Sequence, residues 1–346
     1  MRYEKALEIL KYLKDRENLK IYDSHVHPFD VIGVVRPEIN NKDNNFGLKS
    51  SLIDKLKFNK TANILMRSAS IVAPKFIENS VKEIYQKCSP GTLLNEMDHS
   101  CIDISTLVPV CPWVTIDEIY KYYRDEKRFI YLGSIDIQAI DINEIEPEIE
   151  RQITLFNIKG LKLHPNLQGF YPQPSYNNEI IERKVKKIYD VVSNKKLYIL
   201  FHAGYTNLFS KNKSYRRKDY ALLKNFINNK GQSEIFKNYN FPSVLAHLGN
   251  YAKIFKDRKI IKLIMRKYSN IMFDTSGTDA ATLRWFLENF GSKRLIFGSD
   301  AYYHSMKSAS GLCLECITRT VSKEKIEESI SNIFCRNFEL LLHNYK

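Results

Sequence analysis

The chain has 346 residues, of which 44% are hydrophobic and 27% charged, and its formal net charge is +14. This composition is ample for a large core, and no apolar run reaches the length of a membrane span, which excludes a membrane-spanning protein. The lysines are spread along the whole chain without a dense basic block, which argues against nucleic acid as a partner and favours mild attraction for small anionic molecules.

Residues 1–20 have apolar positions at helical spacing and predict an N-terminal amphipathic helix. The same segment is too charged for a signal peptide. The six cysteines form no disulfide framework. Cys313 and Cys316 form a lone CxxC, which we interpret as two small buried residues on a helix. These features predict a reducing compartment, and the cytoplasm is the expected location.

Residues 21–29, IYDSHVHPF, are the most informative stretch of the sequence. Asp23, His25 and His27 occupy every second position, so on a strand their side chains share one face. Two imidazoles on one rigid strand can converge on a single cation, and neutral imidazole is the commonest ligand of zinc-like metals. Taken alone, the pair fits a solvated strand edge equally well.

Residues 28–99 contain turn signals and helical segments but no clear strand. A connection of this length is usually either functional or a small subdomain. We therefore interpret it as an insertion that covers the site.

The rest of the chain alternates between strand-like and helical patterns. Apolar runs occur at 101–110, 128–137, 158–165, 197–204, 243–249, 270–277 and 294–300. Helical patterns separate most of these runs, among them 179–193 and 279–290, the second of which ends at Gly291 as a C-terminal cap. Apolar strands with helices between them indicate a parallel sheet that is covered on both faces. With the first stretch they make eight units and predict an α/β fold, a (β/α)₈ TIM-like barrel with a helical insertion after strand 1, as a single domain over 1–346 that ends in helices at 301–346.

Polar residues fall at the carboxyl ends of several of these strands. His202, His247 and Asp300 end three of the apolar runs, as His25 and His27 end the first. In a parallel barrel all these ends meet at one mouth, where active sites are built. A single histidine at a strand end is more often a hydrogen-bonded core residue, but so many coincident placements favour a metal site.

The chain resembles the amidohydrolase superfamily of metal-dependent barrels, specifically the amidohydrolase-related (amidohydrolase 2) branch that includes aminocarboxymuconate semialdehyde decarboxylase-like proteins. The resemblance is carried by DSHVHP at 23–28, GLKLHPNLQGF at 160–170, LFHAG at 200–204, LAHLGN at 245–250 and FGSD at 297–300. Each motif is weak by itself, and their order and spacing together are strong.

The resemblance implies a ligand set for a divalent metal, which we expect to be zinc. His25, His27, His202 and Asp300 would ligate it. His247 would be either a catalytic histidine beside a single ion or a ligand of a second one.

Strand 4 bears on the number of ions and on the reaction class. TatD-like deoxyribonucleases share the barrel but usually have a GEIGLD-like strand 4 and an ETD-like strand 8, so GLKLHP and FGSD argue against a nuclease. Some superfamily members carry a carboxylated lysine that bridges two metals where this chain has Lys162. Lys162 and His164 are two positions apart and can both face the lumen. We expect one ion and an unmodified Lys162, with two ions as the alternative.

The expected reaction is hydrolysis of a small-molecule amide, ester or lactone by attack of metal-bound hydroxide. Asp300 would accept the proton of the water and pass it to the leaving group, and His247 would hydrogen-bond the developing oxyanion. Asp23 would orient the first-strand histidines or simply stabilise the barrel, while Asp274 and His304 are further candidates for contact with the ligands or the substrate.

Two other functions remain open at this point. A metal-dependent, non-oxidative decarboxylase of a small carboxylic acid uses the same ligands and is the main alternative. A non-catalytic binding barrel is another. The sequence leaves the substrate, the metal and the oligomeric state open, a homo-oligomer included.

Overall fold

The computed structural model of the protein describes residues 2–31, 85, 88–204, 219–228, 230–249 and 255–343. The predicted insertion at 28–99 therefore lies largely outside the described residues. Its last part, the helix α5 (Pro90–His99), is described and begins at the capping residue Ser89. The Ser89 hydroxyl accepts a hydrogen bond from the backbone of Thr92, as expected of a helix N-cap.

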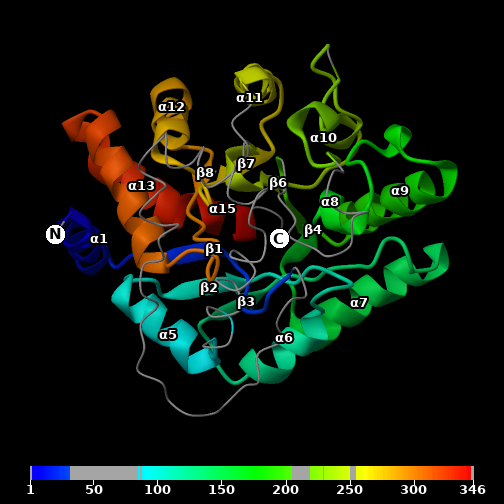
Figure 1. Ribbon diagram of the computed structural model, residues 1–346, viewed down its shortest axis with the longest axis horizontal. Coiled ribbons are helices and arrows are strands. Elements are labelled where there is room, and N and C mark those ends of the chain that lie inside the picture. The colour runs from blue at the N-terminus through cyan, green and yellow to red at the C-terminus, as the bar shows by residue number, and fades with distance from the viewer. Residues whose placement is uncertain are drawn as a thin grey trace, which may run out of the picture.

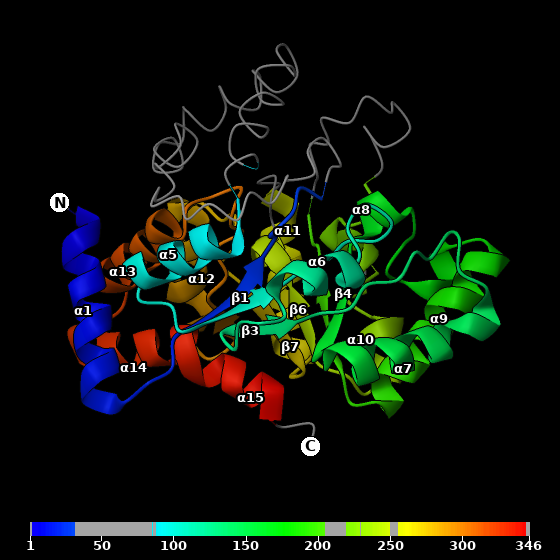
Figure 2. The same ribbon diagram turned by 90° about the horizontal axis from the view of Figure 1, so that it is seen from below.

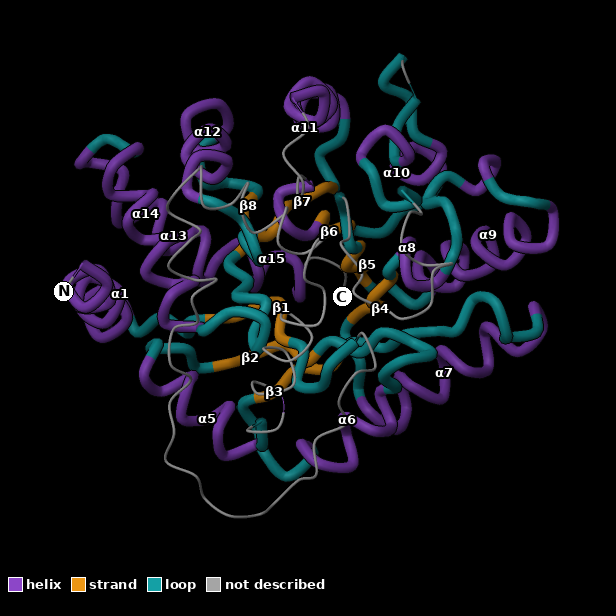
Figure 3. Tube along the Cα trace, viewed as in Figure 1, coloured by secondary structure: helices purple, strands orange, loops and turns teal. Residues whose placement is uncertain are grey.

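Short parallel strands lie at the centre of the molecule and helices surround them (Figures 1 and 3). The strands are β1 (Tyr22–Val26), β2 (Ile104–Leu107), β3 (Phe129–Tyr131), β4 (Gly160–Leu163), β5 (Tyr198–Phe201), β6 (Ser243–Leu245), β7 (Ile271–Asp274) and β8 (Leu295–Ile296). They pair in the order β1-β2-β3 and β4-β5-β6-β7-β8, always parallel. Each strand falls inside one of the predicted apolar runs, and the predicted fold class is confirmed.

The barrel differs from a single closed sheet, because among the described residues its two sheets are joined by isolated bridges. One bridge pairs Gly133 with Leu161 and the other pairs Val26 with Ala301. At the second seam the backbone N–H of His27 donates to Ala301, at 2.6 Å, and that of Asp300 donates to His25, at 3.0 Å. This seam places the end of β1 beside the residues that follow β8.

Helices cover the outside of the strands. Besides α5 they are α1 (Arg2–Glu17), α6 (Ile116–Tyr123), α7 (Ile145–Phe156), α8 (Pro165–Gln168), α9 (Glu179–Asn194), α10 (Glu234–Asn238), α11 (Phe255–Lys267), α12 (Ala280–Phe290), α13 (Met306–Thr320), α14 (Ile326–Ser331) and α15 (Asn337–His343). In α9 the predicted apolar face, which includes Val185 and Ile188, is buried. In α12 the Asp279 side chain caps the start and Gly291, at a φ of 67°, ends the helix.

The helix α15 packs against the amino-terminal ends of the strands. The ring centroid of Phe338 lies 5.4 Å from that of Tyr22 on β1 and 6.4 Å from that of Tyr198 on β5. Leu341 belongs to the same buried cluster. In Figure 2 this helix lies below the strands, so it covers the end of the barrel opposite to the one where the polar residues gather.

The structure also bears on two smaller expectations. Cys313 and Cys316 lie on α13, buried and with free thiols, as the sequence predicts. Among the described helices, none combines the length and the apolar character that a bilayer crossing demands.

Replacing Gly160 by Ala is expected to destabilise the protein. A Cβ at this position would be closer to the backbone oxygen of Tyr198 than real Cβ atoms come. Because backbone atoms of a paired strand cannot move aside cheaply, we expect a loss of about 3 kcal/mol in the free energy of unfolding, measured by denaturant titration.

The control for this variant is Gly291→Ala. That Cβ would have nothing within 4 Å, so only the positive φ of Gly291 opposes the change. Its backbone, at φ 67° and ψ −155°, lies in a region nearly exclusive to glycine, so we expect a loss of about 1 to 3 kcal/mol from strain without any clash. Unchanged stability of Gly160→Ala would contradict the close approach of β4 and β5.

Candidate metal centre

Three of the predicted site residues form a compact group at the seam between β1 and β8. One ligand atom each of His25, His27 and Asp300 lies within 4.8 Å of the others, and all three residues are buried. His25 is on β1, His27 follows it, and Asp300 is held beside them by the backbone hydrogen bonds of the seam. Among the described residues, this is the one group of three or more histidine, cysteine or acidic side chains whose ligand atoms lie close enough together to hold a metal ion.

The hydrogen-bond partners of His25 and His27 define their tautomers. His25 Nδ1–H donates to the Asp274 carboxylate, at 2.8 Å, and His27 Nδ1–H donates to the backbone oxygen of Val108, at 3.0 Å. Both partners are acceptors only, so each neutral ring carries its hydrogen on Nδ1 and a lone pair on Nε2.

The two Nε2 atoms lie 3.0 Å apart. In the neutral rings no hydrogen lies between them, so two lone pairs face each other. A cation between the rings removes this repulsion, and the ionised carboxylate of Asp300, with an oxygen 3.9 Å from His27 Nε2, supplies the negative charge. This donor set fits a divalent transition metal.

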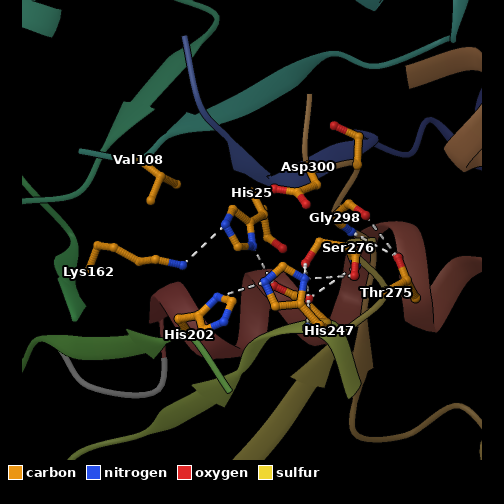
Figure 4. A network of polar contacts seen from close by, with 12 residues as sticks. His25, Val108, Lys162, His202, His247, Thr275, Ser276, Gly298 and Asp300 are labelled. Atoms are coloured by element: carbon orange, nitrogen blue, oxygen red, sulfur yellow. Dashed lines mark hydrogen bonds and ion pairs between the residues drawn. The ribbon is translucent and has the colours of Figure 1, made fainter. Parts of the chain in front are cut away.

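Lys162 lies in the lumen on β4, fully buried, with its Nζ 3.2 Å from His25 Nε2 (Figure 4). Burial lowers the pKa of Lys162 to about 8. Without a metal the ammonium can donate to the lone pair of His25, and a bound ion would take that lone pair in its place.

His202 and His247 follow β5 and β6 and contact each other rather than joining the compact group. His247 Nε2 lies 3.0 Å from His202 Nδ1, and the ring of His247 is 5.5 Å from that of His25. Figure 4 shows His247 between His202 and Ser276. The structure thus brings all five predicted strand-end residues to one mouth, and it groups three of the four expected ligands.

Asp274, at the end of β7, connects both parts of the site. Its Oδ2 accepts from His25 Nδ1–H, and its Oδ1 accepts from the backbone N–H and the hydroxyl of Ser276 and from the backbone N–H of His247, at 2.8 Å. It is completely buried. This carboxylate therefore takes the orienting position that the sequence suggested for Asp23.

Asp23 accepts hydrogen bonds from the backbone instead of from a histidine ring. Its Oδ1 accepts from the backbone N–H groups of His25 and Ser299, at 3.1 and 2.9 Å, and so ties β1 to the loop after β8. Its other oxygen, Oδ2, is buried and has no hydrogen-bond partner among the described residues. The second of the two roles expected from the sequence, stabilising the barrel, is the one that fits this geometry.

His164 stacks on His202, with ring centroids 4.0 Å apart and ring planes 10° from parallel. Its Nδ1 accepts from the backbone N–H of Leu167 at the start of α8, so the neutral ring carries its hydrogen on Nε2. The stack restrains the plane of the His202 ring. His304 is buried after β8, and its backbone N–H donates to the carbonyl oxygen of Asp300.

Several residues at this mouth have unusual backbone conformations. His247, Leu248 and Asp300 have positive φ angles of 59°, 52° and 64°. Each such angle costs about 1 kcal/mol or more for a residue other than glycine, and such strain gathers at functional sites. Here it places the side chains of His247 and Asp300 in the lumen.

Burial and charge set the protonation states of the group. Burial, followed by the positive charge of Lys162, lowers the pKa of His27 to about 4, and the same causes lower the pKa of His25. For Asp300 burial acts to raise the pKa, but the positive charge that the surrounding imidazoles carry when protonated outweighs it, and the net pKa lies below the usual range. The site thus holds neutral imidazoles and an ionised carboxylate at neutral pH, the forms that ligate metals.

Sequence reasoning missed Ser276, Gly298 and the carbonyl of Val108. Ser276 lies two residues after Asp274 within NIMFDTSG, a run whose pattern predicts a strand but gives no sign of a role for the serine. Gly298 is needed because a Cβ there would come within 3.0 Å of the Cβ of His25. A backbone carbonyl carries no sequence signal at all.

Comparisons with known proteins agree with this fold. The family model described as amidohydrolase matches residues 124–311, which is more than half of the chain. The chain therefore belongs to the amidohydrolase family. The matched segment contains His202, His247 and Asp300, whereas His25 and His27 precede it. A comparison with curated proteins finds no match.

Solved structures of similar shape come from enzymes of more than one class. A 5-carboxyvanillate decarboxylase from Sphingomonas paucimobilis is 16% identical, with a TM-score of 0.53 over 94% of this chain and 99% of that chain. Another from Novosphingobium aromaticivorans, complexed with manganese, is 14% identical, with a TM-score of 0.54 over 93% and 95%. A probable 2-pyrone-4,6-dicarboxylic acid hydrolase from Acinetobacter baumannii is 14% identical, with a TM-score of 0.51 over 94% and 99%. At these identities the likeness shows the fold alone.

Proposed function

We propose that the protein is a metal-dependent hydrolase of a small-molecule amide, ester or lactone. The observation that carries the proposal is the pair of opposed Nε2 lone pairs of His25 and His27, 3.0 Å apart beside the buried carboxylate of Asp300. His25, His27 and Asp300 would hold the ion, and His202 would join them as the fourth ligand. When bound, a divalent ion such as zinc supplies Lewis-acid polarisation of a carbonyl and lowers the pKa of a coordinated water towards neutrality.

The protein's own groups would act as follows. Asp300, ionised at neutral pH, accepts the proton of the attacking water at a carboxylate oxygen and delivers it to the leaving group. The ammonium of Lys162 attracts the negative charge of the substrate and of the developing oxyanion, as its place in the lumen 3.2 Å from His25 Nε2 allows. Burial of the group keeps bulk water away from these charges and strengthens their interactions.

Decarboxylation of a small carboxylic acid is the second candidate. The buried Lys162 favours an anionic substrate, and two of the structures of similar shape described above are 5-carboxyvanillate decarboxylases. A carboxylic acid would place its negative charge next to this ammonium. Both reactions are compatible with the same ligand set.

A substrate panel distinguishes the two reactions. The purified protein, loaded with zinc or manganese, would be incubated with aromatic and aliphatic carboxylates, lactones, esters and amides. Hydrolysis of an ester or lactone is measured as proton release, hydrolysis of an amide as amine release, and decarboxylation as carbon dioxide release. Proton or amine release without carbon dioxide supports the hydrolase, and carbon dioxide from a carboxylate supports the second candidate instead. No turnover on any member, in protein that binds metal, would count against both.

Removing the metal is expected to lower the melting temperature. An ion that binds only the folded protein stabilises it by about 2.7 kcal/mol when present at 100 times its dissociation constant. Thermal unfolding would be recorded after dialysis against a chelator and after addition of zinc, manganese or magnesium.

The choice of ions provides the control. Zinc or manganese should restore the melting temperature, and magnesium should restore less, because imidazole nitrogen suits the first two better. An unchanged melting temperature in all samples would contradict the metal centre, whatever the substrate is.

A further inference from the structure

A chain of hydrogen bonds runs from His202 to the buried carboxylate of Asp274. His247 Nδ1 contacts both the backbone oxygen of Ser276, at 2.9 Å, and the Ser276 hydroxyl, at 3.0 Å, and that hydroxyl donates to Asp274 Oδ1. At the other end, His247 Nε2 lies 3.0 Å from His202 Nδ1. The contacts between His202, His247 and Ser276 are drawn in Figure 4.

The direction of this chain follows from its acceptors. The carbonyl of Ser276 only accepts, and the Ser276 hydroxyl spends its hydrogen on Asp274, so Nδ1 of His247 must be the donor. The neutral His247 ring then carries a lone pair on Nε2. His202 Nδ1 must therefore carry the hydrogen of the contact between the two rings, which leaves the lone pair of His202 on its Nε2.

We infer that His247, Ser276 and Asp274 are positioning residues that hold His202 in the Nδ1–H tautomer, with Nε2 as the ligating nitrogen. The inference rests on the metal centre proposed above. It assigns His247 a role other than the oxyanion donor expected from the sequence, because the neutral ring has no hydrogen on Nε2 to donate.

One carboxylate thereby acts on both sides of the mouth. Asp274 Oδ2 accepts from His25 Nδ1–H directly, and Oδ1 acts on His202 through Ser276 and His247. Oδ1 also accepts from the backbone N–H of His247, which lies at a φ of 59°. A ligating histidine whose other nitrogen donates to such a partner has its ring orientation and its basicity set by it.

The tautomers can be read directly by nitrogen NMR of the unmodified protein. The chain has 8 histidines, few enough to assign with single substitutions after labelling the imidazole nitrogens. We expect His25, His202 and His247 in the Nδ1–H form. We expect His164, whose Nδ1 accepts from Leu167, in the Nε2–H form, which makes it the internal reference. An Nε2–H form of His202 would overturn the inference.

Two substitutions of His247 separate positioning from a general structural role. In His247→Gln the longer amide can donate to the Ser276 carbonyl and accept from His202. In His247→Asn the shorter amide keeps the first contact and loses the second, while asparagine tolerates the positive φ well. His343→Asn, at an exposed histidine on α15, is the remote control.

Zinc affinity is measured by competition with a chromophoric chelator, without any substrate. We expect His247→Asn to bind zinc about 10- to 100-fold more weakly than the unmodified protein, and His247→Gln to stay close to it. Equal affinity in the Asn variant and the unmodified protein would overturn the inference and leave the metal centre standing. Absence of stoichiometric zinc in the unmodified protein would overturn both.

Discussion

Asp300→Asn is expected to abolish turnover while the protein stays folded. Asparagine matches aspartate in size and is one of the few residues that tolerate the φ of 64° at this position. The substitution therefore removes the negative charge and the proton acceptor and little else. General acid–base groups contribute factors of about 10² to 10⁴, and loss of a metal ligand adds to this, so we expect a fall of about 10³-fold or more.

The measurement is kcat on whichever substrate the panel identifies, with circular dichroism and thermal unfolding of the same preparation. Asp141→Asn is the matched control, because Asp141 caps a 3₁₀ turn on the surface and asparagine caps equally well. It should keep the unmodified rate. His25→Ala should lose turnover as Asp300→Asn does. Unmodified rates in Asp300→Asn would count heavily against the proposed mechanism.

Gly298→Val is expected to reduce activity about 100-fold without touching a charged group, because a displacement of roughly 1 Å in a reacting group can cost this much. Gly298 lies against β1 and β7, and a Cβ there would come to 3.0 Å from the Cβ of His25 and 3.5 Å from that of Ser276. The added methyl groups of valine push both residues, and with them the His25 ring. Zinc affinity should fall in parallel.

A graded series tests this cause. Gly298→Ala needs shifts of only a few tenths of an ångström and should lie between the unmodified protein and Gly298→Val in both activity and zinc affinity. Gly291→Ala, at a helix end with open space, should change neither. If Gly298→Val lost stability but kept zinc affinity, the steric link between this glycine and His25 would be refuted.

The seam between β1 and the residues after β8 could not be predicted from the sequence, although the order of strands and helices could. The alternation of apolar runs and helical faces predicts parallel strands whose carboxyl ends share one mouth. It does not predict that β1 meets the residues after β8 at a single bridge between Val26 and Ala301. That seam puts Asp300 beside His27, because backbone hydrogen bonds join His27 to Ala301 and Asp300 to His25.

The candidate ligands could be chosen from the sequence because their signal is local. His25, His27, His202, His247 and Asp300 each stand at the end of an apolar run, and parallel strands bring such ends together. Their hydrogen-bond partners carry no comparable signal. A carbonyl of Val108 or a hydroxyl of Ser276 becomes relevant only when the chain has folded around it.

The sequence by itself therefore determined the architecture, the family resemblance and the set of residues at the mouth, since these depend on periodicity and on position within each strand. Only the tertiary structure decided the hydrogen-bond partner of each ring nitrogen at the mouth. It also decided that Asp274, not Asp23, holds the His25 ring. The physical reason is that a tautomer depends on the acceptor opposite each ring nitrogen, and those acceptors come from strands far apart in the chain.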